Sequence, residues 1–131
     1  MLPMDEIQIQ RTPGSGSGSS SDVTIFTLTG PLTIATLFDF QTAIRQPDLK
    51  STIIDFSGVP YVDSAGLGIV LSHWAHTQRI GVKFAAVGIS DRVRVLLEMT
   101  GVSKLLPQYP TAADAERAFS GVTKSPSVAS V

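Results

Sequence analysis

Cysteine is absent from the 131-residue chain, and histidine occurs only twice, as His73 and His76. Without cysteine there is no disulfide framework and no cysteine-based metal or redox chemistry, and two histidines are too few for a rich metal site. Neither sign of charge is in excess, because the formal net charge is -1 and charged residues make up only 16% of the sequence. Domains that bind nucleic acid directly, or an anionic membrane surface, usually carry a basic excess, so we expect neither partner here.

Long apolar runs are missing as well. None approaches the roughly 20 residues that cross a bilayer, and the segment Met1–Glu6 has neither the basic nor the apolar part of a secretory signal. We therefore expect a cytoplasmic domain with no membrane association, cofactor or metal. The apolar content of 43% is ample for one core. The length predicts a single domain, over residues 1–120. The small and polar residues from Gly121 onward predict a disordered C-terminal tail over residues 121–131.

Apolar periodicity and turn residues predict alternating strands and helices. The expected strands are 6–12, 22–29, 51–56, 82–87 and a short one at 104–106. The expected helices begin at Thr33 or Thr36, at about residue 64, after the cap Ser90 and after Thr111. Residues 14–21 contain only glycine and serine and are interpreted as a flexible loop that joins the first two strands in a hairpin. This order favours an α/β fold with a largely parallel sheet.

The most informative position is Ser64, which lies between a β-branched apolar run and a helical apolar pattern. That pattern places apolar residues at i, i+3, i+4 and i+7, namely Leu67, Val70, Leu71 and Trp74. The hydroxyl is therefore expected at a helix N-terminus, where unpaired backbone N–H groups and partial positive charge tolerate an added phosphate. Four roles are open: a nucleophile, a ligand contact, a helix cap or a modification site.

A catalytic role for Ser64 is disfavoured by spacing. The two histidines follow nine and twelve residues later on the same predicted helix, and His73 would lie roughly 13 Å away along the axis. The Gly-x-Ser-x-Gly signature of hydrolases is also absent. We expect no enzymatic activity, with His73 and His76 as surface or partly buried helix residues and Trp74 in the core.

The glycines near Ser64 permit two interpretations. Gly66-Leu67-Gly68 lacks the spacing and the lysine of a phosphate-binding loop, so its plain interpretation is close packing of the helix on the sheet. From spacing alone, Asp63 and Ser64 are most simply an N-cap. However, Ala65, Gly66 and Gly68 leave the first helical turn nearly bare. Small residues around the Ser64 hydroxyl would give the active site of another protein the space to reach it.

The segment from Ile53 to Gly68 closely resembles the signature of the STAS domain family, and more narrowly that of bacterial anti-anti-sigma factors. Residues 87–101 are similar to the strand and helix that follow this signature in the family. Leu28-Thr29-Gly30 also resembles the end of a family strand. The resemblance implies a single STAS-type domain. Its fold would be a mixed, mostly parallel sheet of about five strands, with about four helices packed mainly on one side.

The same resemblance implies a partner-switching regulator. Such proteins bind an anti-sigma factor that is also a serine kinase, and this binding releases a sigma factor. The kinase phosphorylates the serine after the motif aspartate, here Ser64, which switches the regulator off, and a separate phosphatase reverses the reaction. The expected partner surface comprises Asp63, Ser64, Ala65, Gly66, Leu67 and Gly68. The alternative is a STAS scaffold in a lipid-transport or stress-signalling complex.

Two positions depart from the usual family pattern. Pro31-Leu32-Thr33 stands where many members carry Glu-Leu-Asp, so an acidic group near the phosphosite is missing. Ala65 stands where a second serine is common, which leaves Ser64 as the single hydroxyl acceptor in the motif.

Overall fold

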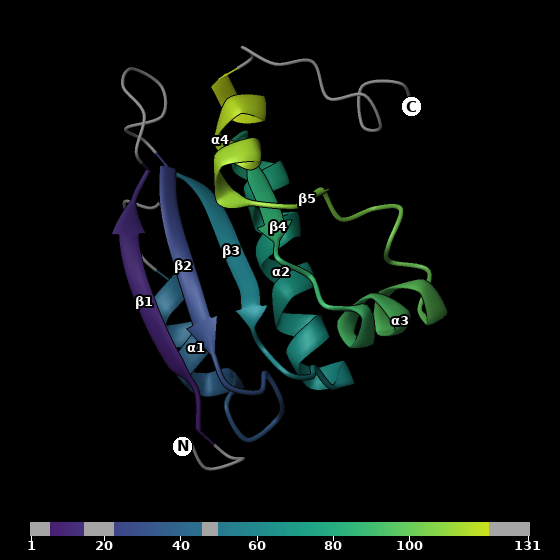
Figure 1. Cartoon of the computed structure of the whole chain (residues 1–131). Coiled ribbons are helices and arrows are strands. Elements are labelled where there is room, and N and C mark those ends of the chain that lie inside the picture. Colours follow the sequence, from purple (N-terminus) through teal and green to yellow (C-terminus); the bar gives the residue numbers. More distant parts are fainter. Residues whose placement is uncertain (1–5, 15–22, 46–49, 121–131) are drawn as a thin grey trace.

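The computed structural model describes residues 6–14, 23–45 and 50–120 (Figure 1). Its strands are β1 (Gln8–Pro13), β2 (Val23–Thr29), β3 (Ser51–Gly58), β4 (Phe84–Val87) and β5 (Gln108–Tyr109). Its helices are α1 (Leu37–Ile44), α2 (Ser64–Ile80), α3 (Asp91–Met99) and α4 (Ala112–Ser120). The predicted order of strands and helices is confirmed.

The five strands form one sheet in the order β1-β2-β3-β4-β5. Strand β1 runs antiparallel to β2, and the remaining neighbours are parallel. The backbone N–H of Gly14 donates to the carbonyl of Val23 (2.8 Å), so the two ends of the first connection lie together, as a hairpin requires. The rest of the predicted Gly/Ser loop and the predicted tail at 121–131 lie outside the described residues.

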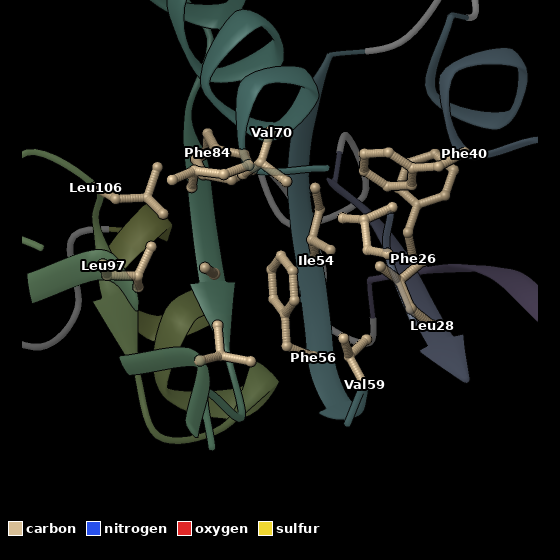
Figure 2. Close-up of a cluster of buried hydrophobic side chains, with 14 of the residues drawn as sticks. Phe26, Leu28, Phe40, Ile54, Phe56, Val59, Val70, Phe84, Leu97 and Leu106 are labelled. Atoms are coloured by element: carbon tan, nitrogen blue, oxygen red, sulfur yellow. The ribbon is translucent and has the colours of Figure 1, made fainter. Parts of the chain in front are cut away.

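The helices divide unequally between the two faces of the sheet. Helices α1, α2 and α3 share a core with one face (Figures 1 and 2), which includes Phe26, Leu28, Phe40, Ile54, Phe56, Val70 and Leu97. Helix α4 covers a smaller part of the other face, where Ala115 packs with Val23, Ile53, Ala85 and Val87. The expected packing of helices mainly on one side is confirmed.

Helix ends follow the sequence signals closely. Gly81 adopts a left-handed conformation (φ 77°) at the end of α2, which glycine reaches without the steric cost that a side chain imposes. The Ser90 hydroxyl accepts from the backbone N–H of Val93 (3.2 Å) at the start of α3. Among the described residues, no helix is both long enough and apolar enough to cross a membrane.

The predicted strand at 104–106 is wrong. The backbone N–H groups of Leu105 and Leu106 both donate to the carbonyl of Val102, at 2.9 and 3.1 Å, so this segment forms a tight turn after α3. The turn places Leu106 in the core at 4% exposure. The last strand, β5, starts only at Gln108.

A buried polar pair joins α2 to the centre of the sheet. His73 Nε2 and the Thr52 hydroxyl lie 2.8 Å apart, and both residues are buried. The imidazole also packs edge-on against Phe84, with ring centroids 5.6 Å apart. Burial, with a smaller contribution from the charge of His76, lowers the pKa of His73 to about 4. His73 is therefore neutral in the folded protein across the physiological range.

This pair predicts a specific loss of stability in acid. The unfolded chain protonates His73 below its ordinary pKa of 6.5, whereas the folded protein resists protonation down to about 4. The His73 contribution is thus complete above pH 6.5 and is lost as the pH falls toward 4. We expect His73 to lower the free energy of unfolding by about 2 kcal/mol between pH 7.5 and pH 5, measured by urea denaturation. His73→Gln should remove this component, and His76→Gln, at an exposed position, should retain it. Equal pH dependence in the wild type and His73→Gln would contradict this assignment.

Candidate functional site

Asp63 uses both carboxylate oxygens to join two segments of the chain. Oδ1 accepts from the backbone N–H of Gly66 at 2.8 Å, which caps the N-terminus of α2. Oδ2 accepts from the backbone N–H of Ile34 at 3.0 Å, in the segment between β2 and α1. The predicted cap is confirmed, and the second bond connects residues 29 positions apart in the sequence.

Backbone pairing reinforces this connection. Leu32 N–H donates to the carbonyl of Tyr61 (3.1 Å), and Asp63 N–H donates to the carbonyl of Leu32 (3.2 Å). Leu32 and Val62 form an isolated parallel bridge, and the Leu32 side chain is fully buried. The two loops therefore lie side by side at the carboxyl ends of β2 and β3, at the lower edge of the sheet in Figure 1.

The segment between β2 and α1 is also held internally. The Thr36 hydroxyl accepts from the backbone N–H of Thr33 (2.9 Å) and donates to the carbonyl of Pro31 (2.8 Å). Thr36 occupies the N-cap position of α1, as one of the two predicted starts required, but its hydroxyl makes no cap bond to the helix. Its hydroxyl bonds within the preceding loop instead.

Ser64 is the first residue of α2 and is exposed. Its hydroxyl makes no hydrogen bond with another residue that the structure describes. His73 cannot serve it as a base, because that imidazole is buried and paired with Thr52. Within the described ranges, no group of three metal-ligating side chains is present. Among the described residues, the Ser64 hydroxyl is therefore exposed and without a hydrogen-bond partner, and His73 is not available to it as a base.

The residues of the predicted partner surface differ in accessibility. Ser64 and Gly68 are exposed, Asp63 and Ala65 are half-buried, and Gly66 and Leu67 are buried. Leu67 belongs to the core. A Cβ on Gly66 would lie 2.2 Å from the carbonyl oxygen of Leu32, whereas a Cβ on Gly68 would meet nothing within 4 Å. The fold itself requires Gly66, and it does not require Gly68.

Two features beside the site were missed by the sequence interpretation. Ile34 and Phe38 are large apolar side chains that remain 72% and 71% exposed. The sequence carries a signal for this exposure, because neither residue lies on the face of the helix that Phe40 and Ile44 bury. The guanidinium of Arg92 also stacks over the Tyr61 ring, 5.2 Å from its centroid. Tyr61 and Arg92 help line a hollow of about 600 Å³ at this edge of the sheet.

Comparison with known proteins gives a consistent result. A model of the STAS domain matches residues 18–115. The anti-sigma F factor antagonist of Paenibacillus polymyxa is 26% identical over 73 residues, which cover 56% of this chain and 62% of that protein. The match thus spans less than two thirds of this relative's length.

Solved structures share the fold over more of the chain. An anti-sigma factor antagonist from Mycobacterium paratuberculosis superposes with a TM-score of 0.74 at 24% identity, over 92% of this chain and 99% of that one. The anti-sigma factor antagonist SpoIIAA in its unphosphorylated form gives a TM-score of 0.65 at 19% identity, over 89% and 100% of the two chains. At these identities the likeness establishes the fold.

The two glycines of the motif provide a matched test of this geometry. Gly66→Ala forces a methyl group against the Leu32 carbonyl, and we expect it to destabilise the protein by about 2–3 kcal/mol or more. Gly68→Ala enters open space on an exposed helix, and we expect it to stabilise the protein by about 0.5–1 kcal/mol. Urea denaturation of both variants measures the difference. A Gly66→Ala variant as stable as Gly68→Ala would show that the two loops do not approach each other as described.

Proposed function

The chain belongs to the STAS domain family, and from this membership we propose that it is a partner-switching regulator controlled by phosphorylation at Ser64. In its unmodified form it binds an anti-sigma factor that is also a serine kinase. This binding releases the sigma factor that the anti-sigma factor holds. The kinase transfers phosphate to Ser64, which ends the interaction, and a phosphatase restores the active form. The protein is the substrate of this chemistry and not its catalyst.

The observation that carries this proposal is the exposed, unpartnered Ser64 hydroxyl directly after the capping Asp63. A kinase must bring the acceptor hydroxyl into its own active site, which requires an accessible serine with little bulk around it. Gly68 and Ala65 provide this clearance on the following turn, and Gly68 is a glycine that the chain's own packing does not need. Relatives named as anti-sigma factor antagonists support the same role.

Electrostatics explains how a phosphate would switch binding without unfolding the domain. A phosphoserine adds about -1.5 to -2 charges at neutral pH. The N-terminus of α2 tolerates that charge, because its free N–H groups and helix dipole are favourable to anions. Next to Asp63, however, the added charge makes the local surface strongly acidic. A partner surface fitted to a neutral hydroxyl would lose several kcal/mol by desolvation and repulsion.

Mass spectrometry after incubation with the cognate anti-sigma kinase and ATP tests the modification site. We expect one phosphate per chain on Ser64, and no incorporation in Ser64→Ala. Ser72→Ala is the matched control, because Ser72 is another exposed serine of α2 and should leave incorporation unchanged. Phosphate on other residues while Ser64 stays unmodified would contradict the proposal and favour the scaffold alternative.

A further inference from the structure

Two of the most exposed large apolar side chains lie on one side of the helical turn that leads into α1. Ile34 and Phe38 are four residues apart, and the backbone N–H of Leu37 donates to the carbonyl of Thr33 at 2.8 Å, which closes a helical turn across this segment. Residues at i and i+4 of a helical segment are neighbours on its surface. The two side chains therefore form one patch, here called the Ile34–Phe38 patch.

The patch is held next to Ser64 by Asp63. One carboxylate oxygen of Asp63 accepts from Ile34 N–H at 3.0 Å, while the other caps the helix whose first residue is Ser64. The hydrogen bond fixes the backbone of Ile34 beside the phosphosite. Other strongly exposed apolar residues, such as Met99 at 80% and Leu105 at 58%, follow or end α3 and have no such connection to Asp63.

A protein that binds at Ser64 would also contact the Ile34–Phe38 patch, because protein interfaces are wide. A standard interface buries about 800 Å² on each partner. A roughly circular footprint of that area reaches about 15 Å from its centre. A kinase centred on Ser64 therefore also covers the Ile34–Phe38 patch. Fully desolvated side chains near the centre of an interface dominate its binding energy, and buried aromatic anchors are prominent among them, which applies here to Phe38.

We infer that the Ile34–Phe38 patch is the anchoring part of the docking surface for the Ser64 kinase, and that it fills an uncharged apolar recess beside the kinase active site. This inference rests on the function proposed above. The docking segment from Gly30 to Phe38 contains no charged residue. A partner that recognises it must offer apolar surface and not a cationic site.

The patch anchors the kinase without touching the reacting atoms. Loss of an anchor weakens the complex equally before and during phosphate transfer, so it raises KM and leaves kcat nearly unchanged. This split distinguishes docking from a role in presenting the Ser64 hydroxyl, which would lower kcat.

The test compares Ile34→Ser, Phe38→Ser and the double variant with the wild type, using the kinase that modifies Ser64. Met99→Ser is the matched control, because Met99 is at least as exposed but lies at the far end of α3. Isothermal calorimetry measures Kd without ATP, and steady-state phosphorylation measures kcat and KM. Thermal melting checks that each variant folds, which is expected because neither side chain fills the core.

We expect each single variant to raise Kd and KM at least about tenfold and the double variant about a hundredfold, whereas Met99→Ser stays within about twofold. If the wild type binds and is phosphorylated on Ser64 but the patch variants match it, the inference is wrong and the proposed function stands. A wild type that neither binds the kinase nor accepts phosphate overturns both. Wild-type dimers in sedimentation that the patch variants abolish would assign the patch to a second copy of this chain and overturn the inference.

Discussion

The corner around Ser64 depends on one carboxylate. Asp63 accepts one hydrogen bond from the first turn of α2 and another from the loop that precedes α1. Hydrogen bonds to a charged acceptor contribute more than neutral ones, typically about 1.5–3 kcal/mol. Each also satisfies a backbone donor that has no partner in regular secondary structure. Without the Asp63 side chain, the hydrogen bonds left between these two described segments are the backbone bonds of Leu32.

The surrounding structure follows from that constraint. The two loops lie so close that a side chain at Gly66 would collide with the Leu32 carbonyl, which explains why the motif needs a glycine there. Ser64 and Gly68 lie on the outer side of this turn, and both are exposed. On the core side, Leu67 and Val70 fix α2 against the sheet, and the buried His73–Thr52 pair fixes it further along. The exposed hydroxyl thus lies at the start of a helix that is packed on the sheet, and we expect a change in its charge to alter the surface and not the fold.

Local signals in the sequence predicted most of the fold. The Asp63 and Ser90 caps and the order of the elements depend on residues close together in the chain, and these predictions are confirmed. The strand predicted at 104–106 is wrong for a local reason, because the backbone N–H groups of Leu105 and Leu106 donate to the Val102 carbonyl and form a turn. Helix α1 begins after Thr36, one of the two predicted positions, but the Thr36 hydroxyl bonds to the preceding loop and not to its helix. The second bond of Asp63 and the placement of the Ile34–Phe38 patch required the three-dimensional structure, because no local pattern connects residue 34 to residue 63. Burial also separated the motif residues, since Gly66 and Leu67 support the surface that Ser64 and Gly68 present.

We propose that the charge on Ser64 controls partner binding while the fold is retained. The most direct test is to measure Kd for the anti-sigma kinase with the unmodified protein and with the protein phosphorylated stoichiometrically on Ser64, alongside amide NMR spectra of both forms. We expect phosphorylation to raise Kd at least about a hundredfold, consistent with a loss of several kcal/mol. We also expect amide shifts to change only near the starts of α1 and α2. Equal affinity of the two forms, or shift changes that extend through the sheet, would contradict it.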